Sequence, residues 1–284
     1  MKRSGKYAYV EGIPCTQGWG VNRQSTASRY VASCTPDGSA AVEGNISEMG
    51  SVNGLGYLPP MPTEDNFEFI GVVSAKAAEI INWCGDVLIA DTTITLPVAS
   101  GTPISWSSSF GVQGELAENP EYHTGAYLDD SRDPAPSAKW GKIAVETVID
   151  EGDWEDIAIQ GATMKFSRGS AQTIEAGLTY HTAGNLEAEI SFEIQDDDRG
   201  NPLLQVNAIK TVRVYVTETL YYQFDAILFS NQSNFKVDRA SNNIIGYTMN
   251  GIWTALRDKA GSGPNDLGEI VYPSGDVFYP TGSS

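Results

Sequence analysis

The sequence is poor in the residues that build disulfide frameworks and metal centres. Its 284 residues include only three cysteines and two histidines. Cys15, Cys34 and Cys84 are odd in number and follow no paired spacing, so we expect reduced, buried thiols rather than disulfides or a metal site. His123 and His181 belong to no H-x-x-x-H or similar pattern. We therefore predict surface histidines, no metal ligands and no cofactor site.

Basic residues are also scarce, because 18 Lys and Arg face 36 Asp and Glu, which gives a net charge of −18. Such a chain is a poor candidate for gripping nucleic acid through its phosphates. No apolar run approaches the ~20 residues of a membrane helix. The basic start at residues 2–6 is not followed by a clean apolar stretch, so we expect neither a membrane span nor a secretory signal, and synthesis in a reducing cytoplasm.

Catalytic signatures are missing as well. The sequence contains no G-x-S-x-G, no G-x-x-x-x-G-K-[ST] and no G-x-G-x-x-G. The glycine-rich run at 50–56 leads into a Pro-rich segment rather than a helix, which favours an exposed loop over a phosphate cradle. The acidic run at 196–198 fails the EF-hand pattern and is typical of a solvated hairpin tip. We predict that the chain is not an enzyme and has no catalytic residues.

What the chain has in quantity is strand-forming sequence. Hydrophobic residues make up 41% and aromatic residues 10%, enough for a folded core. Apolar and polar residues alternate over 91–97 and 104–110, with turn residues at 99–102 between them, which predicts a hairpin. Segment 186–194 alternates cleanly, and 206–216 is rich in β-branched residues and is expected to return beside it. The predicted fold class is mainly β.

One segment, 74–85, has helical spacing and is expected to form a short flanking helix. Its apolar positions at i, i+3, i+4 and i+7 are Ala77, Ile80, Ile81 and Cys84. Ser74 is a suitable N-cap and Gly85 a suitable C-terminal stop. At about three turns the helix would need packing against a sheet to be stable.

The chain also resembles itself, because residues 91–109 align without a gap on residues 232–250. Three weaker blocks lie upstream in each copy: Thr16 and Trp19 with Thr163 and Phe166, Ile46-Ser47 with Ile190-Ser191, and Phe67-Glu-Phe69 with Tyr222-Gln-Phe224. Any two β-domains share alternation, so chance similarity is the alternative. The conserved order of the blocks favours a tandem duplication.

This pattern divides the chain into four parts. A first β-domain spans 1–116, an acidic Pro-rich connector 117–142, a second β-domain 143–256, and an extended C-terminal arm 257–284. The arm carries apolar residues among its glycines and prolines, so we expect it to dock on a neighbouring surface.

At this point the sequence resembles a family, the tail tube proteins of tailed bacteriophages. The resemblance rests on Ile13-Pro-Cys-Thr-Gln-Gly-Trp-Gly-Val21, Tyr30-Val-Ala-Ser33, Gly44-Asn-Ile46, Phe67-Glu-Phe-Ile-Gly71 and the strand Trp106-Ser-Ser-Ser-Phe-Gly-Val-Gln-Gly114. It covers most of the first copy and, more faintly, the second. These motifs are compositional rather than catalytic.

The resemblance implies tandem β-sandwich domains with a short flanking helix, whose strands contribute to a barrel shared between subunits. Rings of six such domains stack into a tube, so a duplicated chain is expected to form a trimer that imitates a hexamer. The candidate interface residues are Ile94, Leu96, Ile104, Trp106, Phe235, Val237, Ile245 and Tyr247. The loop at 50–66 is a candidate ring-to-ring contact.

The resemblance also implies a setting. The protein would belong to the virion tail, assemble in the host cytoplasm, and meet a tape measure protein and terminator or baseplate proteins. DNA would pass through the tube without specific binding, helped by acidic repulsion of phosphates. Two alternatives remain open: a capsid decoration or tail terminator protein, and a carbohydrate-binding or hydrolytic β-sandwich.

Overall fold

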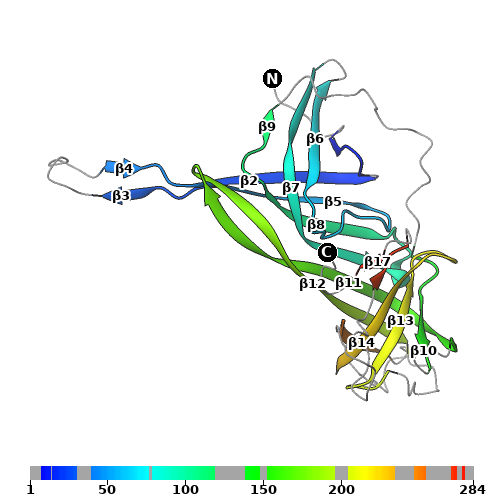
Figure 1. The fold of residues 1–284 in the computed structure, drawn as a ribbon. Helices are drawn as coiled ribbons and strands as arrows, with labels where there is room; N and C mark the ends of the chain where they lie inside the picture. Colours follow the sequence, from blue (N-terminus) through cyan, green and yellow to red (C-terminus); the bar gives the residue numbers. More distant parts are fainter. Residues whose placement is uncertain are drawn as a thin grey trace, which may run out of the picture.

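The computed structural model of the chain is built almost entirely of β-strands, which confirms the mainly β fold class (Figure 1). The structure describes residues 8–13, 15–30, 40–76, 79–118, 138–147, 152–195, 204–233, 246–253, 270–273 and 277–278. The strands are β1 (Tyr9–Val10), β2 (Thr16–Ser25), β3 (Ser28–Tyr30), β4 (Ala40–Val42), β5 (Ile46–Leu55), β6 (Phe67–Lys76), β7 (Glu79–Leu96), β8 (Ser105–Val112), β9 (Ala117–Glu118), β10 (Lys142–Glu146), β11 (Trp154–Glu175), β12 (Leu178–Gln195), β13 (Ile209–Tyr215), β14 (Tyr221–Ser233), β15 (Gly246–Trp253), β16 (Ile270–Val271) and β17 (Val277–Phe278).

The two halves of the chain pair their strands in the same order. In the first half the order is β1-β6-β7-β8-β5-β2, and every neighbouring pair is antiparallel. In the second half it is β10-β13-β14-β15-β12-β11, again antiparallel throughout. Strand β10 also pairs with the start of β11, so the hydrogen-bonded strands of the second half close into a ring.

Irregularities in the pairing recur at matching places. The β2–β5 register shifts between Thr16 and Gly18, and the β11–β12 register shifts between Ile159 and Gly161. A second shift follows Ile89 in the β7–β8 pair, and its counterpart follows Phe229 in the β14–β15 pair. Because a β-bulge bends a strand at one defined position, the matching bulges align the two halves residue by residue.

The two halves share one sheet. Residues 91–96 of β7 pair antiparallel with residues 162–167 of β11, which joins β2-β5-β8-β7 to β11-β12-β15-β14 in a continuous eight-strand order. We call the β7–β11 pairing the internal seam. Behind it, the segment between β5 and β6 holds the halves together: Tyr222 donates its hydroxyl hydrogen to the carbonyl of Tyr57, and Arg168 donates to the carbonyl of Pro62 at 3.3 Å.

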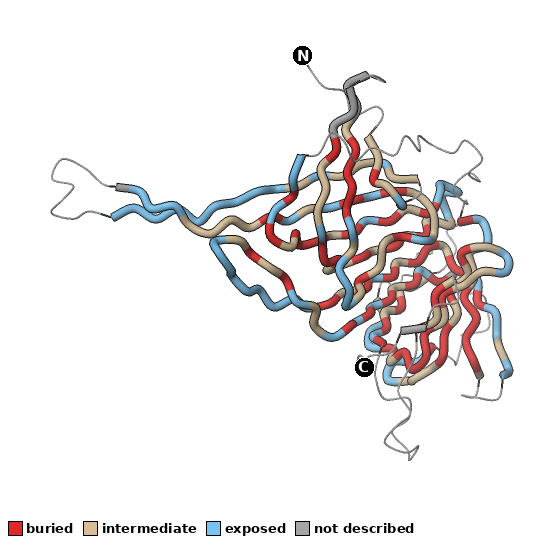
Figure 2. The backbone as a smooth tube through the Cα atoms, turned by 45° about the horizontal axis from the view of Figure 1, so that its top comes forward, coloured by how far each residue is buried: buried red, intermediate tan, exposed pale blue. Residues whose placement is uncertain are grey.

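Two hairpins project from the body of the molecule on the same side (Figure 1). The longer one continues β2 and β5 into the β3–β4 ribbon, and residues 22–30 along it are exposed (Figure 2). The shorter one is the end of β11–β12, whose turn at Ala176 and Gly177 has positive φ angles. Its tip rests on the base of the longer hairpin, because the Ile46 amide donates to the Gly177 carbonyl at 2.8 Å.

The core consists of the residues that alternate with polar ones along the strands. In the first half Phe69 contacts both Trp19 and Phe110, with ring centroids 5.5 and 4.9 Å apart. In the second half Phe166 lies at the centre of an aromatic cluster with Tyr222, Phe224 and Tyr272. Period-two alternation places all of these side chains on one face of their strands, away from the polar face.

The predicted helix at 74–85 is wrong. Residues 67–76 and 79–96 are the strands β6 and β7, paired with each other as a hairpin. The spacing of Ile80, Ile81 and Cys84 fits a helix, but the same segment also contains β-branched residues at neighbouring positions. Those residues favour a pleated strand. The neighbouring strand β6 supplies its backbone hydrogen-bond partners.

The C-terminal arm lies on its own chain where the structure describes it. Strand β16 pairs with β14, and Ile270 and Tyr272 are buried in the core of the second half. Most of the connector falls outside the described residues. Its described ends are β9, which pairs with β7, and residues 138–142, where Ala138 is buried and Lys142 opens β10.

Candidate assembly surface

The eight-strand sheet has one buried face and one polar face. Over residues 91–96 of β7 the buried residues are Thr92, Ile94 and Leu96, and Asp91, Thr93 and Thr95 alternate with them. The register carries this alternation through every neighbouring strand. The polar face is lined by Asn22, Gln24, Ser51, Asn53, Ser107, Ser109, Asp91, Thr93, Thr95, Thr163, Lys165, Glu187, Glu189, Ser191, Glu193, Thr248, Asn250, Asn231 and Ser233. Two exposed apolar residues, Met49 opposite Asn22 and Ile252 opposite Glu189, lie on the same face.

Small hydroxyl and amide side chains dominate this polar face, and its charges are mostly acidic. Glu187, Glu189 and Glu193 are exposed along β12, Asp91 lies at the internal seam, and Lys165 is the basic residue among those lining residues. Ser109 donates a hydrogen bond to Asp91 at 3.0 Å. A surface of this kind holds water well and offers phosphate groups little to bind.

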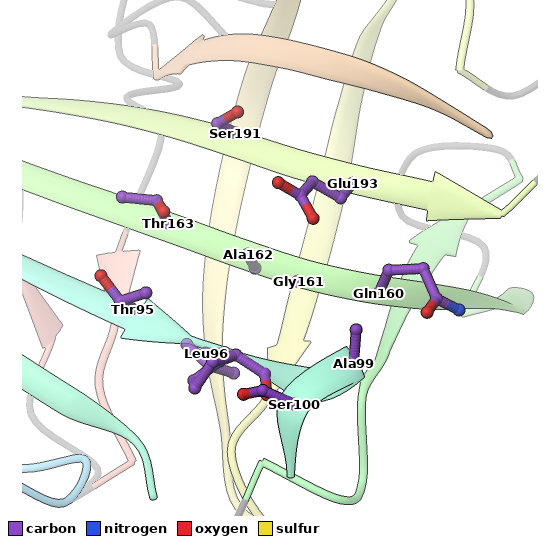
Figure 3. Close-up of a pocket in the computed structure, with 11 residues that line it drawn as sticks. Thr95, Leu96, Ala99, Ser100, Gln160, Gly161, Ala162, Thr163, Ser191 and Glu193 are labelled. Atoms are coloured by element: carbon purple, nitrogen blue, oxygen red, sulfur yellow. The ribbon is translucent and has the colours of Figure 1, made fainter. Parts of the chain in front are cut away.

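Two hollows indent the polar face at the internal seam. The first, of about 250 Å³, lies where β7, β11 and β12 run side by side, with Thr95, Thr163 and Glu193 on its walls (Figure 3). The second, of about 390 Å³, extends towards β14 and β15, and its lining mixes polar residues such as Lys165 and Asn231 with the apolar Ile252. Both hollows are lined by strands from the two halves, so both lie at the internal seam.

The sequence-predicted interface residues lie elsewhere. Four of them, Ile94, Leu96, Ile104 and Trp106, are buried in the core of the chain itself, and the Trp106 indole donates to the Leu55 carbonyl at 3.2 Å. Tyr247 is half-buried and packs against the core of the second half. Phe235, Val237 and Ile245 fall outside the described residues.

These placements put four of the apolar positions in the core of the single chain. The surface residues are the polar ones between them, such as Ser105, Ser107 and Ser109. Their alternation was visible in the sequence, but only the pairing order could show that eight strands share one such face.

The expected ring-to-ring loop at 50–66 is also differently placed. Residues 50–55 belong to β5. The carbonyl of Pro60 accepts hydrogen bonds from Thr92 and Ser108, and Glu64 forms an ion pair with Arg168 at 3.2 Å. The two hydrogen bonds fix the segment within the first half, and the ion pair links it to the second half of the same chain.

An aromatic patch lies on the opposite side of the second half, on β10, β11, β13 and β14. The Arg213 guanidinium lies 3.7 Å from the centre of the Trp154 ring and 4.7 Å from that of Tyr221. Its Nε also donates to Gln223 at 2.8 Å. Because the guanidinium already stacks on both rings, the patch is occupied by the protein's own cation, which does not favour sugar stacking.

An ion-pair cluster fixes the base of the longer hairpin. Glu48 is 2% exposed, and its carboxylate accepts hydrogen bonds from the Arg23 guanidinium and from the Leu116 amide. Arg23 also pairs with Glu115. The hydrogen bond to Glu48 is the main cause of a raised Arg23 pKa. This arrangement holds β2 flat against β5 at the edge of the sheet.

His181 was expected at the surface, but its side chain is only 7% exposed. The ring lies over Gly111, where an added Cβ would come within 2.6 Å of it. The backbone of His181 exchanges hydrogen bonds with the Gln113 side chain at 2.7 and 2.8 Å. Desolvation lowers the pKa of His181 below its ordinary value of 6.5.

This burial predicts a pH-dependent stability. Below pH 6.5 the unfolded chain takes up a proton on His181 that the folded chain resists, so the free energy of unfolding should fall as the pH drops from 7 towards 5. The slope from one proton is at most about 1.4 kcal/mol per pH unit. Urea unfolding at several pH values should show this slope reduced in His181→Phe, which keeps a ring over Gly111. Equal slopes in the two proteins would contradict the assignment.

The described part of the chain holds no cluster of three or more His, Cys, Asp and Glu residues that could bind a metal ion. It also holds no helix long and apolar enough to span a membrane. Comparison of the chain with protein-family models and with curated proteins gives no match.

Proposed function

We propose that this chain is a structural virion protein that assembles into stacked rings, forming the tail tube through which a bacteriophage ejects its DNA. The single observation that carries the proposal is the internal seam. Two halves with the same pairing order are joined edge to edge into one sheet, and the sheet has a continuous polar face. Such a chain behaves as two ring segments linked in tandem, as a gene duplication would produce.

The polar face suits the lining of a DNA conduit. Acidic side chains on β12 repel phosphates, and serine, threonine and asparagine present no strong cation to hold them. The opposite face is filled by the chain's own core, so the polar face is the side available to a lumen. The net charge of −18 gives the rest of the surface the same sign.

The projecting hairpins suit contacts between rings. The β3–β4 ribbon stands well clear of the body, and Tyr30 and Val42 on it are 44% and 49% exposed. A two-stranded ribbon with exposed apolar residues is marginal in water and gains stability by lying against another surface. Because the ribbon continues the two strands at one edge of the sheet, it can reach a neighbouring ring while the sheet stays within its own ring.

A tail tube of this kind implies defined partners and a defined location. The chain would assemble with copies of itself as trimeric rings of six domains, and the tube would meet a tape measure protein inside and terminator and baseplate proteins at its ends. DNA would pass through without specific binding. The protein would act without a cofactor and without catalysis, in the tail of the virion after assembly in the host cytoplasm.

Negative-stain electron microscopy of the purified full chain across a concentration series tests this function. We expect rings with threefold symmetry that stack into tubes as the concentration rises, because ring closure buries strand edges that are open in the free chain. A small oligomer that never forms rings and instead binds added capsids would contradict the proposal and identify a decoration protein. Rings that cap added tubes without stacking would identify a terminator.

A further inference from the structure

Both outer edges of the eight-strand sheet lack a partner strand among the described residues. At one end, residues 22–24 of β2 pair with β5 on one side, and no described strand lies on the other. At the opposite end, residues 231–233 of β14 pair with β15 on one side, and no described strand lies on the other. Unpaired edges of this kind are templates for another chain.

The internal seam shows how such edges meet. At the seam Lys165 lies opposite Thr93, and Ser167 lies opposite Asp91. The matching bulges identify the equivalent positions on the outer edge strands β2 and β14. Since Ser51 is opposite Gly20 and Ser191 is opposite Thr163, positions 20, 22 and 24 of β2 correspond to 163, 165 and 167 of β11.

The positions on β14 that are equivalent to those of β7 follow in the same way. In the β7–β8 pair, Asp91 follows the bulge and lies opposite Ser109. In the β14–β15 pair, Asn231 follows the bulge and lies opposite Asn250. Positions 91 and 93 of β7 therefore correspond to 231 and 233 of β14.

From these equivalences we infer that β14 of one copy pairs antiparallel with β2 of the next, with Ser233 opposite Asn22 and Asn231 opposite Gln24. This external seam repeats the internal one between chains. The inference rests on the proposed ring assembly and adds to it which edges meet, in which direction and in which register.

The residues at the two edges agree with this role. Asn22, Arg23, Gln24, Asn231 and Gln232 are exposed in the single chain. At the internal seam, Phe166 lies opposite Thr92 on the buried face, and the equivalent positions outside are Arg23 and Gln232. An aromatic residue is tolerated at the internal seam because that edge is always paired. The outer edges are unpaired before assembly, and polar residues there protect the free chain from aggregation.

Cysteine pairs test the register in the full-length chain, with Cys15, Cys34 and Cys84 replaced by serine. Directly opposite residues have Cα atoms about 4.5–5.5 Å apart, within the range of a disulfide, whereas diagonal neighbours lie about 7–8 Å apart. The matched variants are Asn22→Cys with Ser233→Cys, and Gln24→Cys with Asn231→Cys. The mismatched controls recombine the same four substitutions as 24 with 233 and 22 with 231.

We expect the matched variants to form disulfide-linked oligomers, ending at three chains, at least about tenfold faster than the controls, as judged on denaturing gels without reductant. Faster linking in the controls, or equal linking in all four, would overturn the register. Each variant is also imaged by microscopy.

The two measurements separate the inference from the function. Rings without matched links would overturn the external seam and leave the tube function in place. Matched links without rings would support the seam and contradict the tube. Neither links nor rings would overturn both.

Discussion

Replacing Phe166 by alanine is expected to lower the free energy of unfolding by about 3–5 kcal/mol. Phe166 is fully buried on β11, and its ring centre lies 5.7 Å from those of Phe224 and Tyr272 and 5.9 Å from that of Tyr222. The substitution removes an aromatic ring from the middle of this cluster and leaves a cavity that the surrounding rings cannot fill. The same strand forms the internal seam, so its loss of packing also loosens the joint between the halves.

Urea unfolding followed by tryptophan fluorescence measures this effect. Phe166→Leu is the matched control, because it keeps much of the apolar volume while losing the aromatic contacts, and it should cost clearly less than alanine. A loss below about 1 kcal/mol for Phe166→Ala would mean that the cluster is not a tightly packed core. The midpoint and the slope are both needed, since a changed slope would indicate partial unfolding at the seam rather than a weaker core.

The sequence was a good guide wherever alternation was long and the turn chemistry was clear. The hairpin predicted from 91–97 and 104–110 is the β7–β8 pair, and its turn contains a short 3-10 helix at Val98–Ser100 followed by Gly101 with a φ of 64°. The strand at 186–194 lies within β12. In these segments the period of two and the turn residues agree with each other, so local sequence is sufficient.

Partners in the sheet were harder to predict than strands. Segment 206–216 does contain β13, but β13 pairs with β10 and β14 rather than returning beside β12. β12 pairs instead with β11, the strand directly before it, and with β15, which lies three strands further along the chain. Pairing between distant strands depends on long-range packing, and alternation alone carries no information about which edge a strand will meet.

The proposed repeat shows the same limit. The ungapped match of 91–109 with 232–250 aligns β15 with β8 correctly, because both of their bounds differ by 141 residues. The same match misaligns β14 with β7 by one position, because the equivalent bulges in these strands lie one residue away from it. The upstream blocks were misaligned: Gly20 matches Thr163, and the segment at 67–69 lies in β6 whereas 222–224 lies in β14. Short alternating segments fit one another in several registers, and bulges leave no clear mark in the sequence.

The polar face, which we propose as the assembly surface, was missed for a related reason. Apolar residues such as Ile94 and Trp106 were assigned to an interface because they are the most distinctive feature of their strands, yet a chain of this size needs them for its own core. The polar residues between them, including Thr93 and Ser107, look unremarkable one strand at a time. They become a surface only when the pairing order places eight such strands side by side.

Replacing Tyr272 by alanine is expected to lower the free energy of unfolding by about 3–4 kcal/mol, close to the effect at Phe166. Tyr272 is 5% exposed and meets Phe166 and Tyr222 edge to face, with ring centres 5.7 Å apart in both cases. It follows β16, which pairs with β14. The side chain thus fills the core of the second half, although the sequence around it suggested an arm reaching for a neighbour.

The two roles for this segment make opposite predictions. If Tyr272 fills the core of its own chain, Tyr272→Ala destabilises the isolated chain at concentrations too low for assembly, and Tyr272→Phe, which keeps the ring, restores most of the loss. If the segment served only to dock on another subunit, dilute Tyr272→Ala would unfold at the wild-type urea concentration and only ring formation would suffer. The same distinction applies to removal of residues 257–284: a failure to assemble after that deletion would reflect a weakened fold, because the deletion takes Ile270 and Tyr272 from the core.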